Sequence, residues 1–307
     1  MRRNIFLFVP CLVSLLAATF AAFAPSAGAA SITDSEQRTI EFSQPFKRII
    51  SLYPGHTTNL LDLGLNQEII ACNTNEARLP DRPVIQYDED PERLLALKPD
   101  MVLVRPMVSR AYPDLVSILE KNNVRVVSLQ PTNAAELFAY WLTLGKLTGR
   151  EQQAQAMVET FNKKVAAIAE SLQKIPQEKR KRVYFEAMHQ QMKTFAANSI
   201  AMFVLESAGG INIATDAKRM RETNIAAYGK EHILAKAGQI DVYLAEHGRM
   251  NPVSVEDIVN ESGFEVIKAV RDKQVFLVDE KMVSRPTMEL LDGIRFVHSL
   301  LYPESAF

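Results

Sequence analysis

Nine side chains that can bind a metal or an anion follow short apolar segments of this 307-residue sequence. They are Tyr53, His56, Arg105, Met107, His189, Lys193, His247, Arg249 and Arg285. Histidine, tyrosine and methionine can ligate or contact a metal centre, whereas arginine and lysine hold carboxylates and other negative groups. Any one of them alone is expected to be a solvated loop side chain. Their repeated placement after apolar segments predicts a shared ligand site.

The apolar segments alternate with amphipathic ones, as strands and helices do in an α/β fold. In the first half we expect strands at residues 48–52, 68–72, 101–104 and 124–129, and helices at 57–63, 91–97, 112–122 and 133–147. In the second half we expect strands at 182–188, 242–245 and 274–279, and a closing helix at 290–301. Continuous apolar strands separated by helices indicate a mostly parallel sheet covered on both faces. Such sheets bind ligands beyond the carboxyl ends of their strands.

A long helix is predicted between the two halves. Residues 151–175 contain neither Gly nor Pro, and their apolar residues recur at helical spacing. At a rise of about 1.5 Å per residue this helix is roughly 37 Å long, enough to cross a domain. An ordinary surface helix inside one domain is the alternative. We expect an α/β protein with two Rossmann-like lobes, residues 30–149 and 177–307, joined by one long rigid inter-lobe helix at 150–176.

The N-terminus predicts export. Met1 to Asn4 is a basic start, residues 5–23 are apolar apart from two hydroxyl side chains, and a small-residue processing site ends at Ala29. We expect residues 1–29 to be a signal peptide and the mature chain to be a soluble periplasmic protein. An uncleaved membrane anchor is the alternative, which Pro10 and Pro25 disfavour. Cys11 lies too early in the apolar run to be a lipid-attachment site.

Composition and motifs narrow the classes of function. A formal net charge of −1 gives no reason to expect nucleic acid as a partner. Cys72 is the one cysteine of the mature chain, so no disulfide can form within it. The sequence lacks the G-x-S-x-G, G-x-x-x-x-G-K-[ST], G-x-G-x-x-G and H-E-x-x-H motifs, and its five histidines show no close metal-ligand spacing. We therefore expect the protein not to be an enzyme.

A weak internal repeat relates the two lobes. Residues 92–103 parallel residues 231–244, with one or two inserted residues. In each copy a glutamate, Glu92 or Glu231, opens a helix that leads through a turn into a strand. A carboxylate in the first helical turn is stabilised by the helix dipole, so capping alone is one interpretation of both glutamates.

Several short segments, taken in order, carry a family resemblance. They are residues 48–57, 63–65, 91–100, 144–149, 207–212 and 301–304. With them the chain resembles the class III periplasmic substrate-binding proteins of ABC importers, which bind ferric siderophores, haem and cobalamin. The resemblance covers most of residues 47–303. It implies a ligand cleft between two lobes and one exposed glutamate per lobe that docks on arginines of the permease, here Glu92 and Glu231.

Two positions depart from the family pattern. The family often has a glutamate where Asn59 stands, and a second arginine shortly after the pair Arg285-Pro286, where this chain has Thr287-Met288-Glu289. The missing arginine weakens the case for an anionic ligand at that loop.

Three functions stay open at this point. The first is a receptor that captures an iron chelate, haem or corrinoid, and so a ligand containing iron or cobalt, and delivers it to an ABC permease with its ATPase. The second is a receptor for a bare metal ion or small oxyanion, with His56, His189 and His247 as candidate metal ligands. The third is a periplasmic enzyme or envelope scaffold. The resemblance implies a monomer without a permanent cofactor. It does not name the ligand, because one ligand cleft is reused in such folds for unlike molecules.

Overall fold

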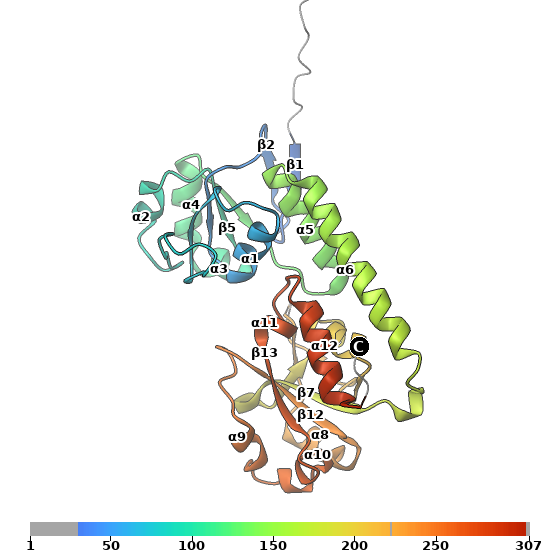
Figure 1. Ribbon diagram of the computed structural model, residues 1–307. Coiled ribbons are helices and arrows are strands. Elements are labelled where there is room, and N and C mark those ends of the chain that lie inside the picture. Colours follow the sequence, from blue (N-terminus) through green and yellow to red (C-terminus); the bar gives the residue numbers. More distant parts are fainter. Residues whose placement is uncertain (1–29, 222, 305–307) are drawn as a thin grey trace, which may run out of the picture.

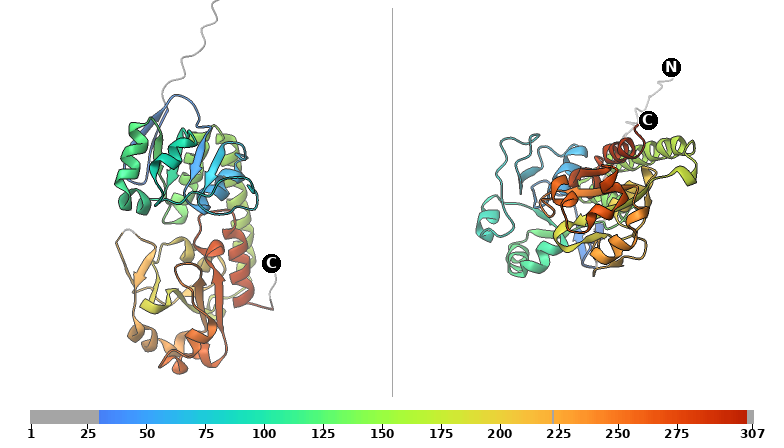
Figure 2. Two further views of the ribbon diagram at one scale, coloured as in Figure 1. Left: turned by 90° about the vertical axis from the view of Figure 1, so that its left-hand side faces the viewer. Right: turned by 90° about the horizontal axis from the view of Figure 1, so that it is seen from below.

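The computed structural model describes residues 30–221 and 223–304. It has two α/β lobes, with the helix α6 (Glu151–Leu172) running along one side of both (Figures 1 and 2). The predicted fold class, two lobes joined by a long helix, is confirmed. The predicted signal peptide lies outside the described residues. Within the described part of the chain, no helix is both long enough and apolar enough to cross a membrane.

The N-terminal lobe is built on a parallel sheet of four strands in the order β4-β3-β5-β6. Its strands are β3 (Ile49–Ser51), β4 (Ile69–Cys72), β5 (Met101–Val104) and β6 (Arg125–Ser128), and a separate hairpin is formed by β1 (Ala30–Thr33) and β2 (Thr39–Phe42). Its helices are α1 (Pro54–Asp62), α2 (Pro91–Ala96), α3 (Pro106–Ala111), α4 (Pro113–Lys121) and α5 (Ala134–Thr148). Helix α3, which the sequence pattern did not predict, begins with a proline at its first position, where no backbone donor is needed.

The C-terminal lobe has a mixed sheet in the order β10-β11-β8-β7-β12-β13, with β9 also paired to β7. Its strands are β7 (Arg182–Met188), β8 (Lys193–Phe195), β9 (Ile211–Asn212), β10 (Lys218–Arg219), β11 (Ile225–Ala227), β12 (Val242–His247) and β13 (Val275–Asp279). Its α-helices are α7 (Ile200–Ser207), α8 (Lys230–Ala235), α9 (Val255–Val259), α10 (Lys268–Arg271), α11 (Glu280–Val283) and α12 (Leu290–Leu301). Four 3-10 turns lie at Gln177–Lys179, His189–Gln191, Ala237–Gln239 and Phe264–Val266. The antiparallel strands β8, β10 and β11 extend the parallel sheet beyond the predicted strands.

Successive residues of each central strand point to opposite faces of the sheet, so each face needs its own apolar layer. In β5, Met101 and Leu103 join one buried cluster, while Val102 and Val104 join another. In the C-terminal lobe Phe185 joins the first of these clusters, and Tyr184 joins a third. The helices on both faces of each sheet follow from this alternation.

The helices α5 and α6 form a close antiparallel pair because of two glycines. A Cβ atom at Gly145 would lie 2.6 Å from the Cβ of Ala154, so only glycine lets the helices approach this closely. Gly149 ends α5 with φ 66°, in the left-handed region that favours glycine. The chain can therefore reverse within two residues and enter α6.

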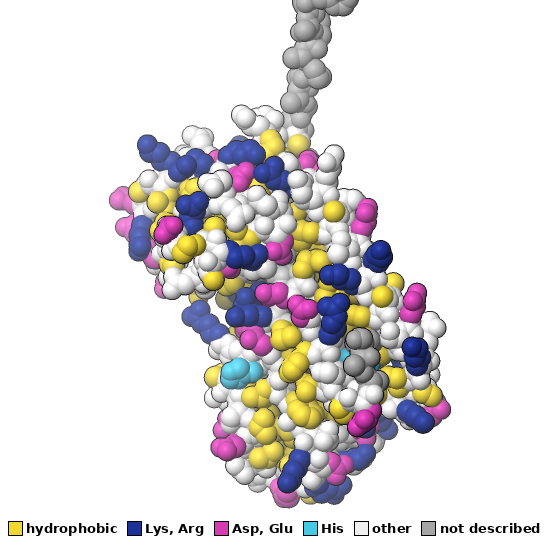
Figure 3. Space-filling view, viewed as in Figure 1, with side chains coloured by type: hydrophobic (Ala, Val, Ile, Leu, Met, Phe, Trp, Pro, Cys, Tyr) yellow, Lys and Arg dark blue, Asp and Glu magenta, His cyan; other side chains and the backbone are white. Residues whose placement is uncertain are grey.

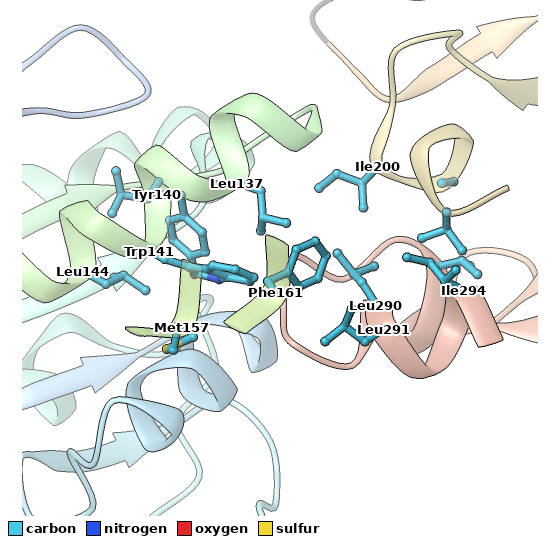
Figure 4. Packing of buried hydrophobic residues seen from close by; sticks show 14 of the residues in the cluster. Leu137, Tyr140, Trp141, Leu144, Met157, Phe161, Ile200, Leu290, Leu291 and Ile294 are labelled. Atoms are coloured by element: carbon cyan, nitrogen blue, oxygen red, sulfur yellow. The ribbon is translucent and has the colours of Figure 1, made fainter. Parts of the chain in front are cut away.

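One hydrophobic core runs through both lobes. The cluster that holds Leu103 of β5 also holds Val278 of β13, and the two are linked by residues of α5, α6, α7 and α12. Phe161 of α6 is fully buried at its centre, with its ring 5.3 Å from that of Trp141 and 6.2 Å from that of Phe203. Figure 4 shows Phe161 between Trp141 of the N-terminal lobe and Leu290 of the C-terminal lobe. Lobe orientation is thus fixed by packing as well as by the connecting helix.

Replacing Phe161 with alanine should lower the free energy of unfolding by about 3–5 kcal/mol, because it removes a fully buried ring from this shared core. Because both lobes depend on that core, urea unfolding should remain one cooperative transition in the wild type. The matched control is Phe296→Ala on α12, where the side chain is 38% exposed and the change should cost less than about 1 kcal/mol. Equal effects of the two changes, or separate unfolding of the lobes, would contradict this account.

Candidate ligand site between the lobes

Three of the predicted site residues meet where the lobes face each other. Tyr53 follows β3, Arg105 follows β5, and Arg285 lies in the segment between α11 and α12 that reaches the N-terminal lobe (Figure 1). The guanidinium carbon of Arg105 lies 4.3 Å from the centroid of the Tyr53 ring. A Cβ atom at Gly55 would lie 3.2 Å from Cγ of Arg285 and 2.5 Å from Cε1 of Tyr53, so glycine allows both side chains to pack there.

Two carboxyl groups of the C-terminal lobe complete this group. Glu280 accepts a hydrogen bond of 2.9 Å from Arg285 Nη2, and Glu246 is 8% exposed near the end of β12. Both carboxylates and both guanidinium groups act electrostatically on Tyr53. We call these five residues, Tyr53, Arg105, Glu246, Glu280 and Arg285, the inter-lobe site. In Figure 3 basic and acidic side chains gather side by side at the boundary between the lobes.

Burial sets the protonation of two members of the inter-lobe site. It raises the pKa of the Tyr53 phenol, against the opposing effect of Arg105 and Arg285, so Tyr53 is a neutral hydrogen-bond donor at pH 7. Burial also raises the pKa of Glu246 to about 7, and the negative charge of Glu280 adds to this rise. Near neutral pH Glu246 therefore exists in both forms, and its neutral form can donate a hydrogen bond.

The inter-lobe site holds hydrogen-bonding atoms that no described residue satisfies. They are Nε of Arg105 and Nε of Arg285, both of them buried. A buried donor or acceptor without a partner costs about 1–3 kcal/mol. Guanidinium groups bind oxygen atoms of carboxylates and other oxyanions strongly and with defined geometry. The arrangement is therefore suited to an anionic oxygen ligand placed between the two lobes.

A buried chain of hydrogen bonds positions the two arginines. His56 is fully buried, with Nε2 3.1 Å from the carbonyl oxygen of Val104 and Nδ1 2.6 Å from the hydroxyl of Tyr140. The Asn59 amide donates to the same hydroxyl at 3.2 Å and to the carbonyl oxygen of Pro286 at 2.8 Å. The chain thus links the residue before Arg105 to the residue after Arg285.

The position of His56 differs from that of an exposed ligand contact. Because a carbonyl oxygen only accepts, Nε2 carries the proton, and Nδ1 accepts from Tyr140. Burial lowers the pKa of His56 to about 3, which keeps the ring neutral. Neither ring nitrogen is available to a metal in this structure.

His189 and Lys193 lie at the two ends of the turn between β7 and β8 in the C-terminal lobe. His189 Nδ1 lies 2.9 Å from the buried carboxylate of Glu186, and this hydrogen bond, together with the negative charge of Glu261, raises the pKa of His189. Its backbone amide donates to Asn251 at 2.8 Å. Lys193 Nζ donates to the side chain of Gln191. These contacts hold the turn after β7 and give His189 a role in the local fold.

The remaining predicted residues are exposed. His247 follows β12 and has Nδ1 2.9 Å from the carbonyl oxygen of Val253, and Arg249 lies two residues further along the same loop. Met107 is 53% exposed on α3, and its sulfur accepts a hydrogen bond of 3.1 Å from Arg105. Among the described residues, no group of three His, Cys, Asp or Glu side chains could hold a metal ion. The structure therefore does not bring His56, His189 and His247 together.

Two surface cavities lie away from the inter-lobe site. One, of about 530 Å³, is lined by residues that include Asp100 and Arg125. The other, of about 590 Å³, is lined by residues that include Lys181 and Gln274. All four residues lie at or just before the amino ends of strands. Ligands of open α/β sheets bind at the carboxyl ends, where the inter-lobe site lies.

Sequence reasoning did not select Glu246 and Glu280. A signal existed for Glu246, because it is the one charged residue within the apolar strand Val242-Tyr243-Leu244-Ala245-Glu246. A carboxyl group at the buried end of such a strand is costly unless it has a function or a partner. Glu280 gave no such signal, since its pairing with Arg285 depends on the geometry of α11.

Comparison with known proteins shows the family of this protein. The family model described as periplasmic binding protein matches residues 49–282. The chain belongs to this family. It is 21% identical to the uncharacterized ABC transporter substrate-binding lipoprotein YvrC of Bacillus subtilis, over 90% of this chain and 86% of that protein. It is 23% identical to the molybdate-binding protein MolA of Haemophilus influenzae, over 97% of this chain and 90% of that protein.

A solved structure shows the same fold. The possible iron-binding, periplasmic solute-binding protein of Staphylococcus epidermidis has a TM-score of 0.72 and 23% sequence identity, covering 84% of this chain and all of that one. The predicted resemblance to class III substrate-binding proteins is confirmed. This periplasmic binding protein is the solute-binding component of an ABC transporter, works with a permease and an ATPase, and is not an enzyme.

Replacing Glu246 with glutamine should change how stability depends on pH. The carboxyl group binds more protons in the folded than in the unfolded protein between pH 4.5 and about 7, so its contribution to the free energy of unfolding falls through this window and is constant above it. Glutamine removes that fall, which amounts to up to about 3 kcal/mol. Urea unfolding at several pH values measures it, with the exposed Glu265→Gln as matched control. Parallel curves for wild type and Glu246→Gln would refute the assignment.

Proposed function

We propose that this periplasmic binding protein captures an anionic metal species in the inter-lobe site and delivers it to its permease, after export and removal of residues 1–29. The observation that carries the proposal is the meeting of Arg105 and Arg285 at Tyr53, from opposite lobes. Two guanidinium groups from separate lobes can each bind an acidic oxygen of one ligand. Such a ligand then stabilises the arrangement in which both lobes contact it.

The first candidate ligand is an iron chelate with acidic groups, which includes ferric siderophores with carboxylates and haem with its propionates. The arginines would hold these acidic groups, and the neutral Tyr53 phenol would donate a further hydrogen bond. The exposed Met107 beside Arg105 offers a soft apolar surface for the organic part of the chelate. A corrinoid ligand fits less directly, since it would need acidic groups to engage both arginines.

A small oxyanion is the second candidate. The relative MolA is named as molybdate-binding, and two arginines and a phenol form a compact set of donors for a tetrahedral oxyanion. Both candidates use the same charged centre and differ in the size of the rest of the ligand. Loss of binding in the arginine variants below is therefore expected for either, and the ligand that binds tightest distinguishes them.

Permease docking is proposed for Glu92 and Glu231. Both are exposed in the first turns of α2 and α8, which lie on different lobes (Figure 1). Asp90 already caps α2, because its carboxylate accepts from the Glu92 amide at 3.0 Å. The Glu92 carboxylate is therefore not required as the cap and is free to meet a basic surface of the permease.

Replacing Arg105 or Arg285 with glutamine should weaken binding of the anionic ligand about 10- to 100-fold, as expected for loss of a charged hydrogen bond. The titrations use ferric citrate, haem, cobalamin and molybdate. The single tryptophan reports binding, because Trp141 Nε1 donates to the carbonyl oxygen of Pro286 at 3.4 Å, next to Arg285.

The matched control is Arg295→Gln on α12, an exposed arginine paired with Asp292. It should bind every tested ligand like the wild type. Unchanged affinity in Arg105→Gln and Arg285→Gln for a ligand that the wild type binds would refute the proposed site.

The double change Glu92→Ala, Glu231→Ala should lower ligand uptake by cells while leaving the affinity of the purified protein unchanged. Exposed charge pairs are each worth roughly 0–1 kcal/mol, so the double change should exceed either single change. Uptake of labelled ligand is measured in cells that carry the cognate permease. Normal uptake, or lost ligand affinity, would exclude the docking role.

A further inference from the structure

Within the inter-lobe site, Glu280 occupies the position that an acidic group of a ligand would take on Arg285. Its Oε1 accepts from Arg285 Nη2 at 2.9 Å, and the arginine side chain is 13% exposed. Its other oxygen lies against the backbone of Gly248, where an added Cβ atom would come within 2.5 Å of Oε2. The Glu280 carboxylate thus lies between the guanidinium group of Arg285 and the backbone of Gly248.

With Glu280 in this position, some hydrogen-bond donors of Arg105 and Arg285 still have no acceptor. Nε of Arg285 and Nε of Arg105 make no hydrogen bond to any described residue, although both are buried. The Glu280 side chain is 32% exposed, so its carboxylate has a path to solvent. A ligand group that reaches both guanidinium groups would gain donors that Glu280 does not use. An anion that reaches only Arg285 would have to break one charged hydrogen bond to form another.

We propose that Glu280 is an internal competitor for the anion-binding face of Arg285, and that a ligand binds only by displacing it. This inference rests on the proposed function of the inter-lobe site. It adds which anions the site selects. Anions that bridge Arg105 and Arg285 displace Glu280, whereas chloride and other small ions that contact one arginine do not. Glu280 thereby sets the specificity of a basic site that faces periplasmic salt.

Two variants test the competition by different means. Glu280→Gln removes the charge but keeps the size, and should raise the affinity for molybdate or ferric citrate about tenfold or more, followed by Trp141 emission. Gly248→Ala keeps the charge but places a methyl group against the Glu280 carboxylate. It should also raise the affinity for these probes, because the methyl group displaces the Glu280 carboxylate from Arg285. Both variants should also bind chloride more readily, seen as stronger inhibition of probe binding by chloride.

The matched control is Glu289→Gln, a half-buried glutamate four residues after Arg285 that accepts from Thr287 rather than from an arginine. It should leave the affinity within about twofold of the wild type.

Several results would overturn the competitor role. One is unchanged binding of both probes in Glu280→Gln and Gly248→Ala, including no binding by any variant. Another is an equal gain in Glu289→Gln. If Arg285→Gln loses binding while Glu280→Gln and Gly248→Ala bind like the wild type, the proposed function stands and the competitor role fails. If Arg285→Gln binds like the wild type, the proposed function itself fails.

Discussion

The packing of Phe161 between Trp141 and Phe203 is the interaction on which the rest of the structure depends. Its ring joins α6 to α5 and α7 at the centre of the core that both lobes share, and so helps to fix the geometry of the inter-lobe site. Because one apolar core runs from β5 through α5, α6 and α12 to β13, packing holds the two lobes in one relative orientation. Close-packed protein interiors do not deform continuously, so this core also restrains the loops that follow its strands.

The shared core also explains why the inter-lobe site is built from residues far apart in sequence. Trp141 and Asn59 both donate to the carbonyl oxygen of Pro286, at 3.4 Å and 2.8 Å, and so fix the segment that carries Arg285 against the N-terminal lobe. The family resemblance implies a glutamate at the position of Asn59. Here an amide is the suitable side chain, since a carboxylate could not donate to a carbonyl oxygen. A neutral buried network thus supports a charged site next to it.

Sequence reasoning recovered the parts that depend on local periodicity. The strand ends that carry Tyr53 and Arg105, and the helix from Glu151, follow from apolar runs and helical spacing. The sequence could not show that His56 is buried and unavailable to a ligand, because the hydroxyl group bonded to its Nδ1 belongs to Tyr140, 84 residues away. The strands β10 and β11 are two and three residues long, too short for a pattern. Glu280 was missed because its contacts with Arg285 and Gly248 depend on how α11 packs against the end of β12.

A crystal structure of the protein loaded with its native ligand, with anomalous scattering from the metal, tests the central claim most directly. We predict the metal between the lobes, with ligand oxygen atoms within hydrogen-bond distance of both Arg105 and Arg285, about 2.7–3.0 Å. A metal held by histidines alone, or a ligand bound on another surface with neither arginine in contact, would contradict it.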